Sequence, residues 1–250
     1  MPAPIGLQLY TVRDALAKDF DGVVRRIAAM GYAGVEPANM FGKSLQDAVK
    51  LFKSLGLQVP AAHIKLPTDK QAIDTALTLG CKYIVIPWIS PDEFKSVDKI
   101  KALCAQLNEA SAAAQKNGLK LAYHNHDFEF APLDGKLPHE IMQENLDPAV
   151  GFELDTYWIK TAGQDPAKVT RELGKRAPLL HIKDGPAVRG QPMVAAGEGK
   201  IDIPAIVKAG EGSAEWLIVE LDECATDMMQ AVEKSYQYLV KQGLGRGTKS

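Results

Sequence analysis

Short apolar runs alternate with amphipathic stretches along the whole chain, and each apolar run ends in polar or charged residues. The eight runs span residues 5–10, 33–38, 58–64, 83–89, 119–126, 150–155, 178–184 and 216–222. Runs such as YIVIPWI (83–89) are apolar at successive positions, which is typical of parallel strands that are covered by helices. We therefore interpret the eight runs as β-strands.

Apolar residues with helical spacing lie between these runs. The predicted helices span residues 18–30, 43–55, 69–79, 91–117, 136–146, 165–175, 202–210 and 226–242. In the first of them, Phe20, Val24 and Ile27 fall on one face, Asp19 can cap the start, and Gly31 can end the helix in the left-handed conformation. Strands that alternate with helices predict parallel pairing with helical crossovers.

The number of strand–helix units predicts a (β/α)8 TIM barrel. Eight units within 250 residues match that α/β fold in count and in length. No linker or change in composition divides the chain, so residues 1–250 are expected to form a single domain. The rival architecture, an open doubly wound sheet, lacks support because no GxGxxG motif follows the first strand.

Composition and charge exclude several classes of protein. The chain has 46% hydrophobic and 24% charged residues, and its net charge of −2 offers no positive surplus for nucleic acid. No apolar run approaches the roughly 18–20 residues of a membrane span. The three cysteines (Cys81, Cys104 and Cys224) are far apart, and the N-terminus lacks the pattern of a signal peptide. We therefore expect free thiols and a cytoplasmic location.

Polar side chains gather at the C-terminal ends of the predicted strands. In chain order these residues are Gln8, Glu36, His63, Trp88, His124, His126, Glu153, Asp155, His181, Lys183, Glu220 and Asp222. In a (β/α)8 barrel the C-terminal strand ends meet at one mouth, where such enzymes carry their active sites. We therefore expect one site at this mouth, with Tyr10 and Tyr157 close to it.

The motif HNH at residues 124–126 is informative because residues i and i+2 of a strand share a face. His124 and His126 are therefore predicted to point into the mouth together, while Asn125 faces the helices. His139, at the start of a predicted helix, is interpreted as a structural residue instead.

The convergence of imidazole and carboxylate groups predicts a metal site. Buried charges are costly unless they are paired or bind a metal, and the interior of a parallel barrel is otherwise apolar. Carboxylate and imidazole ligands together suit one divalent ion such as Mn²⁺, Zn²⁺, Co²⁺ or Mg²⁺. Predicted loops at 132–138 and 194–206 lie on the same side and could cover a small substrate.

Four stretches, VGFELDTYW, PLLHIKD, GEGKIDIPAI and WLIVELDE, resemble the xylose isomerase-like barrel superfamily. That superfamily includes sugar phosphate isomerases and epimerases, tagatose 3-epimerase, inosose dehydratase and endonuclease IV, and the chain looks most like its YHNHDFEF branch. The resemblance implies one divalent metal ion held by Asp155, His181 and Glu220. Where many relatives read LALENH, this chain reads LAYHNH, so His124 stands at the position of the usual fourth ligand, a glutamate. His126 or Glu153 are the alternatives to His124.

Two enzymatic functions fit such a site. The first is a metal-dependent isomerase or epimerase that removes the proton next to the carbonyl of a small sugar or keto-sugar. The second is a lyase or dehydratase, similar to inosose dehydratase, that starts with the same proton abstraction and then eliminates water or an alcohol. A repair endonuclease is not expected, since the chain has five histidines and no basic surplus. A non-catalytic sugar-binding barrel would keep the aromatic residues Tyr10, Trp88, Tyr157 and Trp158 without turnover.

The resemblance also implies roles within the site. Glu220 is predicted to be the base, because it is the glutamate retained from the acid/base pair of the epimerases. His126 is predicted to be the partner acid, since an unperturbed histidine titrates near 6.5, with Lys183 as the alternative acid. Lys183 is otherwise expected to hold a substrate oxygen or an enolate. Substrate contacts are expected from Gln8, Tyr10, Glu36, His63, Trp88, Glu153 and Tyr157. The expected partner is a small carbohydrate, and assembly of identical copies is left open.

Overall fold

The computed structural model describes residues 1–40 and 42–248, and within them eight parallel strands form the centre of the molecule. The strands are β1 (Ala3–Gln8), β2 (Gly34–Glu36), β3 (Ala61–His63), β4 (Tyr83–Ile86), β5 (Lys120–His124), β6 (Gly151–Asp155), β7 (Leu179–Ile182) and β8 (Trp216–Val219). They pair in the order β2-β1-β8-β7-β6-β5-β4-β3. Between β2 and the segment before β3, Val35 N–H donates to Gln58 O over 2.9 Å and Gln58 N–H donates to Ala33 O over 3.0 Å. These bonds nearly close the ring, so the predicted TIM barrel is confirmed.

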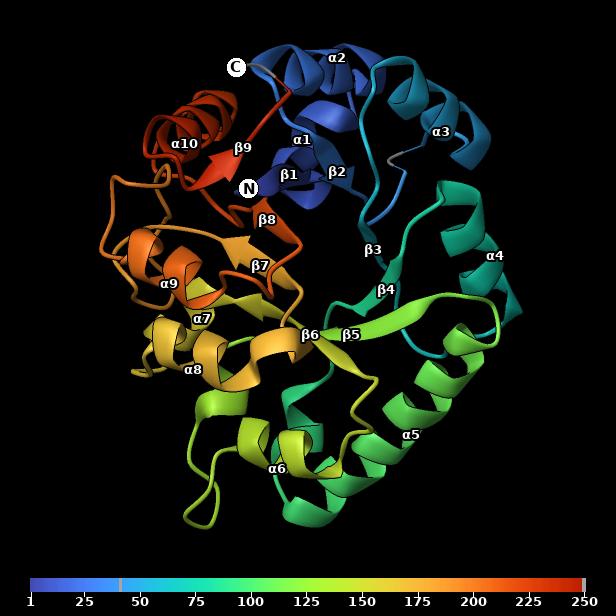
Figure 1. The fold of residues 1–250 in the computed structure, drawn as a ribbon, viewed down its shortest axis with the longest axis vertical. Helices are drawn as coiled ribbons and strands as arrows, with labels where there is room; N and C mark the ends of the chain where they lie inside the picture. The colour runs from blue at the N-terminus through green and yellow to red at the C-terminus, as the bar shows by residue number, and fades with distance from the viewer. Residues whose placement is uncertain (41, 249–250) are drawn as a thin grey trace.

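Helices surround the strands, as Figure 1 shows. They are α1 (Arg13–Leu16), α2 (Phe20–Met30), α3 (Leu45–Ser54), α4 (Lys70–Leu79), α5 (Val97–Gln115), α6 (Pro138–Asn145), α7 (Thr156–Thr161), α8 (Pro166–Leu173), α9 (Ile203–Ala209) and α10 (Met228–Lys241), with short 3-10 turns η1 (Leu9–Val12), η2 (Pro91–Phe94), η3 (Phe128–Phe130) and η4 (Gly174–Arg176). The predicted cap and end residues of α2 are confirmed, although the helix begins at Phe20 and not at residue 18: Asp19 accepts a hydrogen bond from Gly22 N–H, and Gly31 has φ 112°.

The structure contains three short elements that were not predicted, and it divides one predicted helix into two. The helices α1 and α7 follow β1 and β6 almost directly and are too short to show a helical pattern of apolar residues. A two-residue strand, β9 (Gly245–Arg246), pairs with the start of β1. The predicted helix at 91–117 is divided into η2 and α5, because Ser96 caps a new helix by accepting a hydrogen bond from Lys99 N–H.

The lower part of the barrel interior, toward the N-terminal ends of the strands, is apolar. Its buried side chains are Ala33, Ala61, Tyr83, Val85, Ala122, Leu179, Trp216 and Ile218. Trp216 fits there because Gly34 has no side chain: a Cβ at Gly34 would lie 2.9 Å from the Trp216 ring and 2.6 Å from Gln58 O. A larger apolar core fills the space between the strands and the helices. Burial of each large apolar side chain contributes roughly 1.5–3 kcal/mol to folding.

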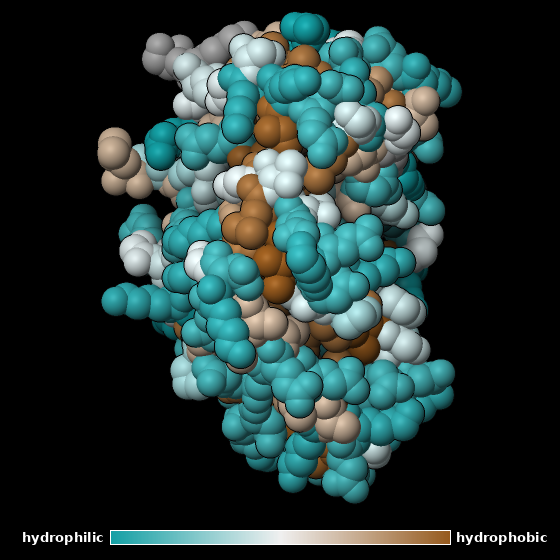
Figure 2. Space-filling model, turned by 90° about the vertical axis from the view of Figure 1, so that its right-hand side faces the viewer, coloured by the Kyte–Doolittle hydropathy of each residue, from teal (hydrophilic) through white to brown (hydrophobic). Residues whose placement is uncertain are grey.

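The outer surface of the helices is largely hydrophilic. On the face turned to the viewer in Figure 2, apolar side chains are confined to narrow strips between hydrophilic ridges. Across the described part of the chain, none of the helices combines the length and the apolar character needed to cross a membrane. Cys81, Cys104 and Cys224 are free thiols, as predicted.

Candidate metal centre

A layer of polar side chains lies above the apolar part of the barrel interior, at the C-terminal ends of the strands. It contains the buried residues Gln8, Glu36, His124, Glu153, Asp155, His181, Lys183 and Glu220. All of these come from strands or directly follow them, as the sequence predicted. The barrel thus brings four carboxylates, a lysine and two imidazoles into one water-poor volume, with the ring of His63 beside them.

Four of these residues form a group that could hold a metal ion. The ligand atoms of His124, Asp155, His181 and Glu220 all lie within 4.8 Å of one another. His181 Nδ1 lies 2.9 Å from Glu220 Oε2, and His124 Nε2 lies 3.6 Å from Asp155 Oδ2. A second possible group shares His124 and His181 and adds His63 and Glu153. Its ligand atoms also lie within 4.8 Å of one another.

The ring nitrogens of the two shared histidines favour the first group. His124 Nδ1 lies 3.0 Å from Glu153 Oε2, and His181 Nε2 lies 2.8 Å from Glu36 Oε2. Carboxylates in this position accept the N–H of a metal-ligating histidine and fix its tautomer and orientation. The opposite nitrogens, His124 Nε2 and His181 Nδ1, then offer their lone pairs on the side of Asp155 and Glu220. Two carboxylates and two imidazoles fit a divalent ion such as zinc or manganese.

Lys183 lies inside the same group. Its Nζ is 2.8 Å from Asp155 Oδ2, 2.7 Å from Glu220 Oε2 and 2.9 Å from Asp222 Oδ2. Burial lowers the pKa of Lys183, but Asp155, Asp222 and Glu220 outweigh it and hold that pKa well above its usual range. Burial likewise raises the pKa of Glu220, but the Lys183 ammonium and His181 outweigh it and keep that pKa well below its usual range. Glu220 is therefore ionised at neutral pH.

The deeper carboxylates do not share one charge state. Burial, together with the neighbouring Glu153, raises the pKa of Glu36 to about 7. Burial also acts to raise the pKa of Glu153, but His181 and His63 outweigh it and hold that pKa well below its usual range. Burial raises the pKa of Asp155 to about 6, against the opposing effect of Lys183. Several negative groups in one dry layer are a reason for cations to be held there.

A cavity of about 390 Å³ opens onto this layer. It is lined by Tyr10, Ala38, Asn39, His63, Lys65, Pro87, Trp88, His124, His126, Lys183, Glu220 and Asp222. Of these, Tyr10 and Trp88 are 41% and 49% exposed, so their rings face the open side. Asn39 and Lys65 were not predicted, because they lie in loops a few residues beyond β2 and β3, where no periodic pattern marks them.

Four residues predicted to contact the substrate lie outside the lining of this cavity. Gln8, Glu36 and Glu153 are fully buried beneath it, where Gln8 Nε2–H donates to Glu36 Oε2 over 2.9 Å. Tyr157 is buried in α7, with its hydroxyl next to Gly185. In these positions, Glu36 and Glu153 support the two histidines.

His124 and His126 both line the cavity, as predicted, with 5.2 Å between their ring centres. Between them, Asn125 accepts from Asp155 N–H over 3.0 Å and donates to Asp155 O over 3.2 Å, and so joins the ends of β5 and β6. His126 lines the cavity and stacks on Phe128 with 5.4 Å between ring centres. Burial and the nearby Lys183 ammonium lower the pKa of His126 to about 4. At neutral pH the His126 ring is therefore neutral.

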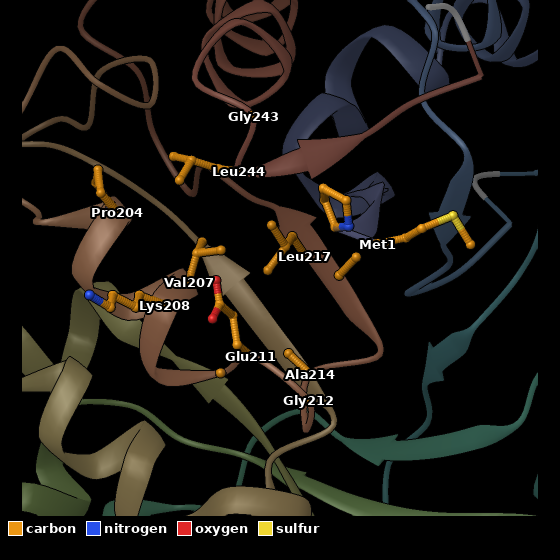
Figure 3. Close-up of a pocket in the computed structure, with 13 residues that line it drawn as sticks. Met1, Pro204, Val207, Lys208, Glu211, Gly212, Ala214, Leu217, Gly243 and Leu244 are labelled. Carbon is orange, nitrogen blue, oxygen red and sulfur yellow. The ribbon is translucent and has the colours of Figure 1, made fainter.

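The opposite end of the barrel has a larger cavity of about 630 Å³ with different chemistry. Figure 3 shows its lining, in which Leu217, Val207 and Leu244 lie around the opening, and Lys208 and Glu211 supply the charged side chains. The residues of both candidate metal groups lie away from this cavity. The chemistry expected from the sequence is therefore concentrated at the C-terminal mouth.

Comparison with known proteins agrees with this fold. Inosose dehydratase of Clostridium beijerinckii is 22% identical over an alignment of 264 residues, which covers 89% of this chain and 87% of that protein. A sugar phosphate isomerase/epimerase from Parabacteroides distasonis matches with a TM-score of 0.84 and 26% identity, over 96% of this chain and 94% of that one. The IolI protein, solved with a bound zinc atom, has the same fold (TM-score 0.70, 19% identity, 97% and 99% covered). Residues 24–241 match the profile of the family described as xylose isomerase-like TIM barrel, and the chain therefore belongs to that family.

Proposed function

We propose that this chain is a metal-dependent isomerase or epimerase that removes the proton next to the carbonyl group of a small sugar or keto-sugar. The observation that supports this most directly is the position of Glu220. Its carboxylate belongs to the four-residue group that could hold a metal and also lines the cavity. A base in this position can act on a substrate whose oxygen atoms are held at the same site.

His124, Asp155, His181 and Glu220 would hold the ion. A divalent ion bound there would polarise the carbonyl and its neighbouring hydroxyl, which makes the adjacent proton more acidic. Glu220 is ionised at neutral pH and takes this proton. Lys183, whose ammonium group lies 2.7 Å from Glu220 Oε2, stabilises the negative charge that develops on the substrate oxygen.

For the return of the proton we favour Lys183, which the sequence offered as the alternative to His126. His126 is neutral because its pKa is lowered to about 4, and so it acts as a hydrogen-bonding partner of the substrate. Lys183 lines the cavity and carries a proton at neutral pH, which makes it our candidate acid.

A second candidate is elimination of water or an alcohol from a keto-sugar. Two observations favour it: His124 stands where many relatives carry a glutamate, which removes one member of a two-carboxylate acid/base pair, and inosose dehydratase is similar over nearly the whole chain. Elimination begins with the same proton abstraction by Glu220. It then needs a leaving group on the neighbouring carbon.

The experiment is a screen of keto-sugars in D₂O, followed by NMR, with purified protein loaded with Mn²⁺, Co²⁺ or Zn²⁺. An epimerase gives deuterium exchange with inversion, and a lyase gives an enone. Glu220→Gln should lower kcat by roughly 10²–10⁴-fold. Glu215→Gln, at the opposite end of the barrel, is the matched control and should keep its rate. Near wild-type turnover in Glu220→Gln with metal still bound would defeat the mechanism.

A further inference from the structure

We infer that Lys183 is the internal counter-ion of the metal-free site, and that its ammonium group and a divalent ion compete for Asp155 and Glu220. The inference rests on the metal site of the proposed function, and it concerns what this lysine does before and after the metal binds. Lys183 is 1% exposed, although lysine is among the side chains least often buried in proteins. Packing alone does not explain why a charged lysine is buried at this position.

The ammonium group is bonded to the same oxygen atoms that the metal would use. Asp155 Oδ2 lies 2.8 Å from Lys183 Nζ and 3.6 Å from His124 Nε2. Glu220 Oε2 lies 2.7 Å from Nζ and 2.9 Å from His181 Nδ1. A divalent ion about 2.0–2.2 Å from these oxygens would therefore lie within about 5 Å of the ammonium. Two cations at that distance in a buried layer repel each other strongly.

Asp222 offers the displaced ammonium a place to go. Its Oδ2 is already 2.9 Å from Lys183 Nζ, its side chain is 34% exposed, and it lines the cavity. An ammonium that leaves Asp155 and Glu220 but keeps Asp222 moves toward the cavity, where it can meet a substrate oxygen. In the metal-free protein the same group is held among the carboxylates. Metal loading would thus also release the cation that contacts the substrate.

The two possible roles of Lys183, competition with the metal and stabilisation of the fold, predict different effects on metal affinity when the lysine is removed. If Lys183 only stabilised the fold, its removal would lower stability and bring no gain in metal affinity. If it competes, its removal leaves Asp155, Glu220 and Asp222 without their cation in the metal-free protein, which destabilises that state. The same change removes the competitor, so that the metal binds more tightly.

The test is Lys183→Met, compared with two variants in which Co²⁺ affinity should stay within about 3-fold of wild type, whatever their catalytic rate. Lys183→Arg keeps the charge, and Lys82→Met removes a lysine that pairs with Glu215 at the opposite end of the barrel. Co²⁺ affinity is measured by competition with a chromophoric chelator, and thermal unfolding is followed with and without Co²⁺. Lys183→Met should bind Co²⁺ at least about 10-fold more tightly and unfold at a lower temperature when metal-free. An affinity equal to or weaker than that of wild type would overturn the inference.

A measurement on the wild-type protein decides the matter if metal-free Lys183→Met does not fold. In a crystal structure with Co²⁺ bound, Nζ should lie beyond about 4 Å from Asp155 Oδ2 while it stays bonded to Asp222. An ammonium that remains bonded to Asp155 beside the metal would refute the competition. A wild-type protein that binds no Co²⁺ would contradict the proposed function instead. In that case the inference stands only if Lys183→Met, refolded with Co²⁺, acquires metal binding.

Discussion

The two ends of the barrel interior are built by the same strands but have opposite chemistry. On β7 the change occurs between Leu179, in the apolar part, and His181, in the polar layer, two residues later. On β8 the apolar residues Trp216 and Ile218 precede Glu220 in the same way. The apolar end gains stability by removing side chains from water. The polar end loses stability by burying charges, and a loss of that kind is expected where function requires it.

The largest expected effect comes from removing a tryptophan at each end of the barrel and comparing the loss of stability. Trp216→Ala should lower the free energy of unfolding by about 3–5 kcal/mol, because it opens a cavity in the apolar end where Gly34 leaves room for the indole. Trp88→Ala, at the rim of the mouth and 49% exposed, should change it by less than about 0.5 kcal/mol. Urea unfolding of the metal-free proteins measures both values. Equal losses at the two positions would show that the mouth carries stability as the apolar end does.

A prediction of intermediate size concerns Glu153, whose carboxylate lies beneath the candidate metal ligands. Glu153→Gln replaces a group that faces His124 and His181 with an amide that can also donate, and so disturbs the orientation of both rings. Metal affinity should fall by about 10–100-fold. Glu129→Gln is the matched control, since Glu129 is equally buried but bonds to Tyr123 and to the backbone of His126. Unchanged Co²⁺ affinity in Glu153→Gln would indicate that this carboxylate does not support the metal site.

The smallest effect concerns a buried histidine outside both ends. His139 packs between Phe130 and Phe152, and neither ring nitrogen has a hydrogen-bond partner in the described part of the chain. Burial, with a smaller contribution from Arg176, lowers the pKa of His139 to about 3. Below about pH 6.5 the unfolded chain binds a proton that the folded protein does not, so stability is lost as the pH falls from about 6.5 toward 3.

His139→Phe should remove this loss. Between pH 7 and pH 5.5 the variant should gain about 1 kcal/mol of unfolding free energy relative to wild type. Urea unfolding at both pH values measures the difference. If both proteins show the same pH dependence, the pKa of His139 in the folded protein is not lowered relative to the unfolded chain. The sequence interpretation of His139 as a structural residue agrees with its buried position.

The sequence was sufficient to predict the barrel and the meeting of its polar strand ends, because both depend on periodicity. Alternation along a strand tells which face a side chain is on, but it does not tell how high the residue lies along the barrel axis. For this reason Glu36 and Glu153 were expected to touch the substrate, whereas they lie beneath the cavity.

The charge states could not be predicted from residue types. The pKa of His126 depends on its burial and on Lys183, which lies 57 positions later in the chain and reaches the same cavity through β7. Asn39 and Lys65 were missed because loops bring them to the cavity without any pattern that marks them. Site residues that lie at regular positions along a strand can thus be recognised from one sequence. Their pKa values cannot, because these depend on neighbours that only the folded structure brings together.

The arrangement around Glu153 has an evolutionary consequence. One oxygen atom, Oε2, lies 2.7 Å from His63 Nε2, 3.0 Å from His124 Nδ1 and 3.1 Å from His181 Nε2. A lineage that replaced the carboxylate would leave three imidazoles without their common acceptor, and one that replaced a single ring would alter the proton positions of the other two. These four positions therefore cannot drift independently. The exposed rim residues Tyr10 and Trp88 share no such acceptor among the described residues and are free of this constraint.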